Sequence, residues 1–144
     1  MDYAVFNNMF DINGLKADIN NVGGSKREEV PHGLYEVEIT KLELGASKKQ
    51  LPMLKVWFKI TAGKYKGSML FMNQLLTSGF GIHTANVFLK SLCTGDNIEF
   101  VDFTQYGQLI DNLFDKVNGA RAFALNYGEN KGFNTFNITE VYSV

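Results

Sequence analysis

An indole between two ammonium groups is the feature of the sequence that points most directly to chemistry. Lys55, Trp57 and Lys59 occupy alternate positions in the segment Met53 to Ile60, so in a β-strand their side chains share one face. An exposed aromatic ring offers a stacking surface to an unpaired base, and lysines on either side of it can contact phosphates. The pattern is typical of a surface that binds single-stranded nucleic acid.

Residues elsewhere repeat this combination of aromatic rings and positive charge. Tyr65 lies between Lys64 and Lys66 in the turn that follows the segment. Nearer the C-terminus, three more residues extend the predicted surface, namely Arg121, Tyr127 and Phe133. The alternative interpretation is that an N-terminal arm or a helix covers Trp57, and that the C-terminal aromatic residues only cap one end of the fold.

The charges are distributed unevenly along the chain. From Lys41 to Lys66 there are seven lysines and one acid, a local balance of +6, although the 144-residue chain has a net charge of −1. From Gly95 to Lys116 the balance is −4. Because salt screens charges beyond about 10 Å, a local basic segment can bind a polyanion even in a nearly neutral protein. The alternative is that these lysines only keep strand faces in solvent.

Three N-terminal strands are predicted to position this surface. The first begins after Pro31, and its apolar residues alternate with polar ones as far as Ile39. The alternation then shifts by one residue to Leu42 and Leu44, which predicts a β-bulge. The third strand, 68–75, is apolar on both faces, so we expect it to be central in the sheet.

Two helices and a hairpin are predicted to follow. The hairpin is predicted to have strands at 120–127 and 133–141 and a five-residue turn at 128–132. Thr77 or Ser78 can cap the first helix, and the apolar spacing from Tyr106 to Val117 predicts a second, amphipathic helix. Together these elements predict a mainly β domain over residues 31–144, a five-stranded OB-like Greek-key barrel with helices between strands three and four. Residues 1–30 are predicted to form an N-terminal arm. A five-stranded α+β sheet with helices on one face is the alternative.

No enzyme signature is present in the sequence. It lacks a Walker loop and a Gly-x-Ser-x-Gly elbow, and Gly79-Phe80-Gly81 lacks the third glycine of a dinucleotide fingerprint. Cys93 ends an apolar helix face, so we expect it to be a buried structural cysteine. Glu36 and Glu38 could form an acid/base pair, but pairing across strands with the lysines of the second strand is a simpler role. We therefore expect no catalysis, no cofactor and no metal site.

The composition is that of a folded, single-domain protein. Hydrophobic residues make up 45% of the chain and charged residues 20%, which is typical of globular domains. No apolar run approaches the roughly 20 residues that span a bilayer, and the N-terminal residues lack the basic and apolar regions of a signal peptide. We therefore expect no membrane contact and a cytoplasmic location.

Several short motifs follow one another in a fixed order between Pro31 and Asn73. They are Pro31-x-Gly33-x-Tyr35-x-Val37-x-Ile39, Leu42-x-Leu44, Ser47-Lys48-Lys49, Pro52-Met53-Leu54, Phe58-x-Ile60-Thr61 and Tyr65-x-Gly67. This series resembles phage-encoded single-stranded-DNA-binding proteins, which belong to a family long described as of unknown function and found in phage replication and recombination modules.

The resemblance implies an OB fold and the binding of single-stranded DNA with little sequence preference. Residue by residue, the implied contacts are Lys48, Lys49, Lys55, Trp57, Lys59, Tyr65 and Lys66. The segment from Glu140 to Val144 holds no acidic run, whereas many single-stranded-DNA-binding proteins recruit replication partners through an acidic tail. The expected partners are single-stranded DNA, replication or recombination proteins, and a second copy joined through the N-terminal arm.

The sequence thus predicts a phage protein that coats and protects single-stranded DNA in the host cytoplasm. One rival is a non-catalytic assembly or virion-associated interaction protein built on the same kind of barrel. Another rival is a small nucleic-acid enzyme that uses Glu36 and Glu38 with a transient magnesium ion.

Overall fold

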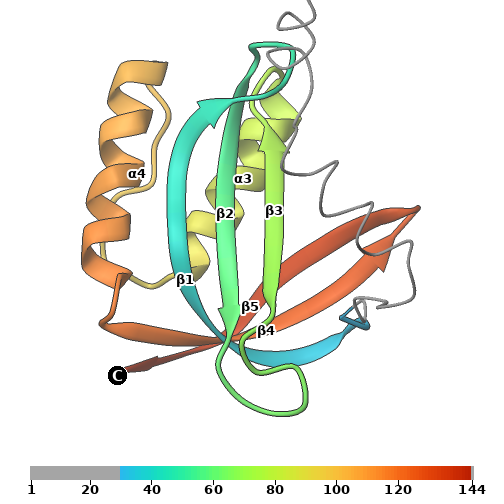
Figure 1. Ribbon diagram of the computed structural model, residues 1–144. Helices are drawn as coiled ribbons and strands as arrows, with labels where there is room; N and C mark the ends of the chain where they lie inside the picture. The colour runs from blue at the N-terminus through green and yellow to red at the C-terminus, as the bar shows by residue number, and fades with distance from the viewer. Residues whose placement is uncertain (1–29, 144) are drawn as a thin grey trace, which may run out of the picture. The chain divides into compact units, whose positions relative to one another are not determined.

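The computed structural model describes residues 30–143, so the arm predicted for residues 1–30 lies outside the described residues apart from its last position. Three strands, two helices and two further strands follow one another, in the order that the sequence predicts (Figure 1). They are β1 (Gly33–Ala46), β2 (Pro52–Ile60), β3 (Met69–Leu75), α3 (Gly79–Ser91), α4 (Phe103–Val117), β4 (Arg121–Asn130) and β5 (Phe133–Ser143).

The five strands form one antiparallel sheet in the order β3-β2-β1-β4-β5. β1 has 14 residues, and this length lets it pair with β2 along its C-terminal part and with β4 along its N-terminal part. β3 and β5 are the two edges and form no ladder with each other, so the sheet is open. The prediction that β3 is central is therefore wrong. Its second apolar face is an exposed one, on which Phe71 and Leu75 lie.

The predicted bulge in β1 is confirmed by the register of its ladder with β2. Ile39 lies opposite Phe58, and the next paired residue, Lys41, lies opposite Trp57. Thr40 is thus an extra residue on β1. Because side chains alternate along a strand, this extra residue allows Ile39 and Leu42 to face the same core although they are three positions apart.

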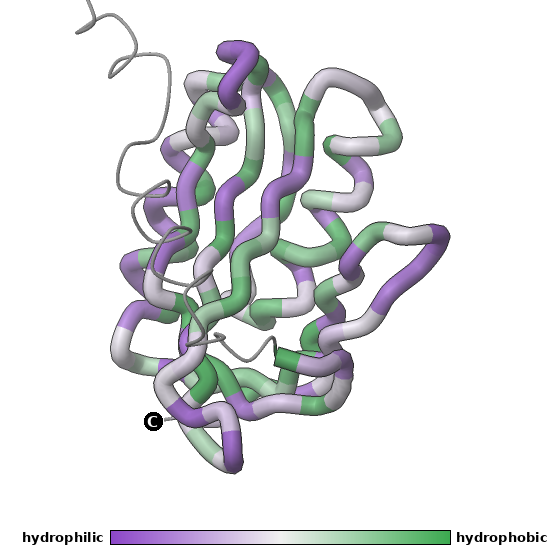
Figure 2. The backbone as a smooth tube through the Cα atoms, turned by 45° about the vertical axis from the view of Figure 1, so that its right-hand side comes forward, coloured by the Kyte–Doolittle hydropathy of each residue, from purple (hydrophilic) through white to green (hydrophobic). Residues whose placement is uncertain are grey.

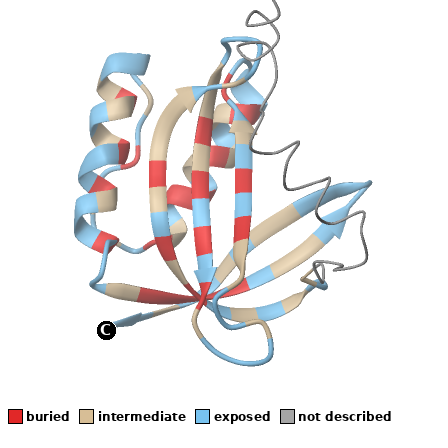
Figure 3. Cartoon of the chain, viewed as in Figure 1, coloured by how far each residue is buried: buried red, intermediate tan, exposed pale blue. Residues whose placement is uncertain are grey.

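The orientation of β2 agrees with its sequence pattern. Its four core residues are fully buried, namely Leu54, Val56, Phe58 and Ile60. Trp57 points to the other side of the sheet and is 38% exposed. Buried and exposed residues therefore alternate along β2 and β3 (Figure 3). The hydropathy of β2 follows this alternation, whereas β3 carries apolar residues on both faces (Figure 2).

Both helices pack against the sheet. The Ser78 side chain caps α3 by accepting a hydrogen bond from the Gly81 amide, and Asp102 caps α4 through the Gln105 amide. The buried face of α4 lies against β1, whereas α3 lies behind β1–β3 in the view of Figure 1 and brings Phe88 edge-on to Phe58 of the core. Among the helices of residues 30–143, none is long and apolar enough to cross a membrane.

The hairpin of β4 and β5 is longer than its sequence predicts. The strands continue to Asn130 and restart at Phe133, so the turn has only two residues instead of five. Both turn residues, Lys131 and Gly132, have positive φ angles, 53° and 83°. Positive φ at both central positions is the geometry of a type I′ turn, whose twist matches that of the two strands.

Candidate nucleic-acid interface

The candidate site is the side of β1–β3 that carries Trp57, which we call the outer face. The ladders place Trp57 between Lys41 of β1 and Phe71 of β3. On one side of this row Lys55 lies between Glu43 and Asn73, and on the other side Lys59 lies between Glu38 and Met69. The outer face comprises these nine residues: Glu38, Lys41, Glu43, Lys55, Trp57, Lys59, Met69, Phe71 and Asn73.

Two aromatic rings touch at the centre of the outer face. The rings of Trp57 and Phe71 are 5.4 Å apart between centroids and are nearly perpendicular, at 89°. Phe71 is 53% exposed, more than Trp57 itself. Burying so much aromatic surface would be favourable, so two exposed rings in contact mark a surface that a partner can cover.

Sequence reasoning missed Phe71 and Lys41 as members of this site. The ammonium group of Lys41 lies 4.3 Å from the centroid of the Trp57 ring, within the range of a cation–π contact. The same nitrogen is 3.1 Å from Glu43. The signal that could have found Phe71 is the second apolar face of 68–75. Two apolar faces can mean that a strand is central in the sheet, or that one of its faces forms an exposed binding surface. The second interpretation would have included Phe71 in the site.

The carboxylates near the lysines lie only partly where they were predicted. Glu38 is opposite Lys59 in the ladder, as expected. Glu36 is not opposite Lys55, because the antiparallel ladder places it next to Thr61, just past the end of β2, and Glu43 lies opposite Lys55. Within residues 30–143 the only ion pairs are Lys41 with Glu43 and Lys116 with Asp96. Neither Lys55 nor Lys59 is therefore held in an ion pair by an acid of this part of the chain.

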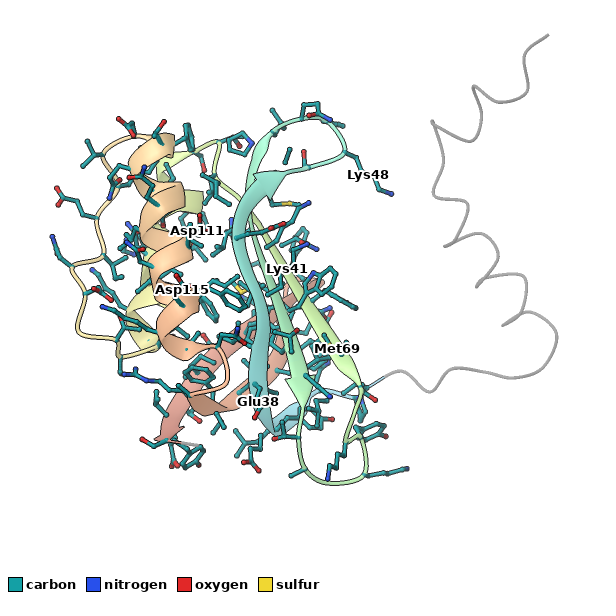
Figure 4. All side chains as sticks on the ribbon, turned by 60° about the vertical axis from the view of Figure 1, so that its left-hand side comes forward. Glu38, Lys41, Lys48, Met69, Asp111 and Asp115 are labelled. Atoms are coloured by element: carbon teal, nitrogen blue, oxygen red, sulfur yellow. The ribbon has the colours of Figure 1, made fainter. Side chains whose placement is uncertain are left out.

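The loop lysines predicted to bind DNA lie at opposite ends of β2. Lys48 and Lys49 are exposed in the loop between β1 and β2, where the Ser47 hydroxyl accepts hydrogen bonds from the amides of Lys49 and Leu51. Figure 4 shows Lys48 in this loop and Lys41 on the sheet. The loop at the other end of β2 carries the remaining predicted pair.

Tyr65 and Lys66 lie in this second loop, between β2 and β3. The Tyr65 ring makes an edge-to-face contact with Tyr35, at 6.1 Å between centroids, and Lys64 lies 5.4 Å from the same ring. Tyr65 is only partly exposed, whereas Lys66 is exposed. The predicted contacts therefore span the whole length of β2 and do not form one compact cluster.

Arg121 is not part of this surface, which corrects the prediction. It begins β4, and its Nη1 atom donates hydrogen bonds to the carbonyl oxygens of Leu92 and Cys93, at 2.9 and 2.8 Å. These are carbonyls at the C-terminal end of α3, which lack partners inside the helix. Arg121 therefore ties α3 to the sheet. No local sequence pattern reveals this contact, because the partners are 28 and 29 residues apart.

The two C-terminal aromatic residues of the predicted surface, Tyr127 and Phe133, lie in different surroundings. Tyr127 is partly buried against Phe136 and His32, at 5.3 and 4.7 Å between ring centroids. Phe136 in turn stacks on the core residue Phe58. Phe133 instead lies beside the hairpin turn and is 77% exposed. Tyr127 thus belongs to the packing of the domain, whereas Phe133 stays available to a ligand.

The prediction that Cys93 is buried is wrong, since its side chain is exposed. Leu92 is the C-cap of α3, and Cys93 follows it with a φ angle of 55°. A residue with positive φ directly after a helix turns the chain away from the helix axis. This turn moves Cys93 out of the apolar face that its spacing had indicated.

The comparisons with known proteins identify one family. A family model described as "Protein of unknown function (DUF669)" matches residues 15–106. The chain belongs to the DUF669 family. The matched residues include β1, β2, β3 and α3, and so the whole outer face. No curated protein matches the chain.

The acidic residues on α4 of this DUF669 chain lie away from the outer face. Asp111 and Asp115 project from α4, on the other side of β1 from the Trp57 row (Figure 4). Lys116 forms an ion pair of 2.7 Å with Asp96 and, through this hydrogen bond, lowers the pKa of the Asp96 carboxyl. In the described residues, 30–143, no three His, Cys, Asp or Glu side chains gather where they could hold a metal ion.

Proposed function

We propose that this member of the DUF669 family is a phage single-stranded-DNA-binding protein. It coats and protects unpaired strands, without marked sequence preference, during replication or recombination in the host cytoplasm. The observation that carries the proposal is the contact between Trp57 and Phe71 on the outer face, with Lys41, Lys55 and Lys59 around it. Stacked bases and neutralised phosphates are the two interactions by which proteins hold single strands regardless of sequence.

The geometry of the row around Trp57 indicates how a strand would bind. Lys41 covers the Trp57 ring in the free protein, at 4.3 Å from the centroid. A base that stacks on this ring displaces the ammonium group, which then lies beside the sugar–phosphate backbone of the same strand. Lys55 and Lys59 lie on either side of the ring along β2 and meet phosphates there.

The arrangement of the strands also supports the proposal. An OB fold is a five-stranded, partly open Greek-key barrel, and it binds oligonucleotides on the face of strands 2 and 3 and on the loops 1–2 and 4–5. In this chain the corresponding parts are the outer face, the loop with Lys48 and Lys49, and the turn at Lys131. We propose that the open sheet and its helices are an OB-like barrel whose edges β3 and β5 do not pair.

The test uses Trp57, the single tryptophan of the chain. Oligo(dT) is titrated into the protein at low salt while the indole fluorescence is followed, and salt is then added. We expect quenching by a stacked base and reversal by salt, with a log–log slope of about −0.7 for each phosphate neutralised. Binding in a gel-shift assay without quenching would move the site away from Trp57. No binding in either assay would overturn the proposed function and favour the assembly protein.

A further inference from the structure

A cleft of about 980 Å³ opens where β3 and β5 fail to pair, next to the outer face. The edge of β3, the exposed side of α3 and the tip of the β4–β5 hairpin form its walls. A volume of this size is at the upper end of the range for small-molecule sites, about 300 to 1,000 Å³. Phe71 belongs both to the outer face and to the lining of the cleft, so the two are continuous.

The lining has an unusual composition for this chain. Three phenylalanines, one from each wall, are well exposed: Phe71, Phe80 and Phe133, with Phe80 at 81% and Phe133 at 77%. Five amide side chains lie between them, namely Asn73, Gln74, Asn130, Asn134 and Asn137. Of the residues that line the cleft, all within 30–143, none is acidic, and Lys131 lies at the hairpin tip. The whole chain, in contrast, has 15 acidic residues.

We propose that this cleft takes unpaired nucleobases from the strand that crosses the outer face. The inference rests on the proposed function and specifies the path of the bound DNA. The single-stranded DNA passes over Trp57 and Phe71, across β2 and β3, and enters the cleft. It does not follow β2 lengthwise from Lys48 to Tyr65. Phe133 stacks on a base, and Lys131 meets a phosphate at the mouth.

The chemistry of the lining fits a base better than an extended peptide. Amide side chains carry both donors and acceptors, and these can match the hydrogen-bonding edge of a splayed base. The exposed rings supply faces on which bases stack. The absence of acidic residues from the lining removes repulsion of the phosphates that accompany each base. A peptide ligand carries no phosphate at each residue, so its binding would not require a lining free of acidic residues.

The experiment compares two cleft variants with matched controls in the full chain. Phe133→Ala removes the exposed ring, and Leu34→Ala removes a similarly exposed apolar side chain outside the cleft. Lys131→Glu changes the charge at the cleft mouth, and Lys90→Glu makes the same change on α3 outside the lining. Binding is measured by fluorescence anisotropy with labelled oligo(dT) of about 4 to 16 nucleotides, the range of OB-fold site sizes. The melting temperature of each variant is recorded as a check of folding.

We expect Phe133→Ala to weaken binding of the longer oligonucleotides by about 5- to 150-fold, the fold-change expected when one base–aromatic stack is removed. The shortest oligonucleotides, which reach only Trp57, should bind as they do to the wild type. Lys131→Glu should also weaken binding of the longer ones, and both controls should stay within about twofold. Photocrosslinking with 5-iodouracil should label peptides that contain residues of the cleft.

Three results would overturn the inference, and the first two distinguish its failure from the failure of the proposed function. If the wild type binds and quenches Trp57, but both cleft variants match their controls at every length, the cleft is not used and only the inference fails. If the wild type does not bind oligo(dT) at all, the proposed function fails and the inference fails with it. Crosslinks confined to the loops with Lys48 and Tyr65 would also refute the path into the cleft.

Discussion

The ammonium group of Lys41 lies over the ring of Trp57 and at the same time within 3.1 Å of the Glu43 carboxylate. One nitrogen thus makes a cation–π contact and an ion pair on the surface where we propose that a base stacks. Any base that takes this position competes with Lys41 for the ring. The ion pair with Glu43 restrains the ammonium group and so opposes its displacement by a base. The Glu43 carboxylate also repels phosphates.

Glu43→Gln should therefore strengthen the binding of single-stranded DNA. Removing the carboxylate frees Lys41 and deletes one negative charge from the outer face, and we expect a gain of about 0.2 to 1 kcal/mol, the size of an exposed ion pair. The gain should shrink as salt is added. Anisotropy titrations at several salt concentrations measure it. The control is Glu99→Gln, which removes one negative charge from the segment between α3 and α4. An equal gain in that variant would show that only the net charge of the protein matters.

Trp57→Ala should weaken DNA binding by about 1 to 3 kcal/mol, the contribution of one stacked base. The fold should survive, because the indole lies on the outside of the sheet and is 38% exposed. Since the variant has no tryptophan, binding is followed by anisotropy of a labelled oligonucleotide. Phe58→Ala, its inward-facing neighbour, should instead lower the stability by about 3 to 5 kcal/mol. Unfolding of Trp57→Ala would mean that the indole is structural.

Lys55→Glu and Lys59→Glu should each weaken binding more than Lys90→Glu does. The first two lysines flank Trp57, and neither forms an ion pair with a residue between 30 and 143, whereas Lys90 lies in the last turn of α3. The salt dependence of binding should become shallower by about 0.7 for each phosphate that the variant no longer neutralises. Equal weakening in all three variants would contradict a localised site. Lys116 is a poorer control, because its ion pair with Asp96 adds a stability effect.

Arg121→Ala should destabilise the protein without changing its affinity for DNA. The guanidinium group donates two hydrogen bonds to carbonyls at the end of α3, and hydrogen bonds from charged groups contribute about 1.5 to 3 kcal/mol each. A urea titration measures the loss of stability, and anisotropy under native conditions measures the affinity. A lower affinity with unchanged stability would return Arg121 to the binding surface.

Alkaline pH should destabilise the domain through Tyr106. This side chain is fully buried, its hydroxyl donates to Asn86 Oδ1, and burial raises its pKa from 10.0 to about 12. Below pH 10 the phenol is neutral in both states, so the stabilisation is intact. As the pH rises from 10 towards 12, only the unfolded chain ionises, and stability falls.

Tyr106→Phe separates this effect from those of the other tyrosines. The variant should be less stable at neutral pH by about 0.5 to 1.5 kcal/mol, because it lacks a hydrogen bond between α3 and α4. The difference from the wild type should then shrink above pH 10. Denaturant midpoints between pH 8 and 11 measure it. Tyr35 and Tyr142, whose pKa values are also raised, are present in both proteins and cancel. A constant difference across this range would show that Tyr106 ionises normally.

The sequence predicted best what depends on local alternation. The period of two along 53–60 placed Trp57 outside and Phe58 inside, and the shift of alternation after Ile39 located the bulge. The Ser78 cap of α3 and the amphipathic face of α4 are equally local signals. These features follow from side-chain geometry within one element, so no tertiary contact was needed to infer them.

Features that depend on distant contacts were missed or misassigned. Phe71 enters the site only because β3 pairs with β2 at one register, and Arg121 leaves it because the end of α3 lies close to β4. Cys93 followed the periodicity of an apolar helix face that had already ended. The sequence also shows which strands exist but not which are edges. The open seam between β3 and β5 therefore could not be foreseen.

The extra residue at Thr40 has a consequence for how the length of this strand can vary. Before it, the outward positions of β1 are Glu36 and Glu38, and after it they are Lys41 and Glu43. Deleting Thr40 would place Lys41 directly after Ile39 and restore regular alternation, so Lys41 would stay outward over Trp57 and Leu42 would stay in the core. Only the bulge, and the local bend that it gives β1, would be lost. A one-residue deletion should thus be tolerated better at this bulge than within the regularly paired segments on either side of it, where it would turn the following side chains to the opposite face.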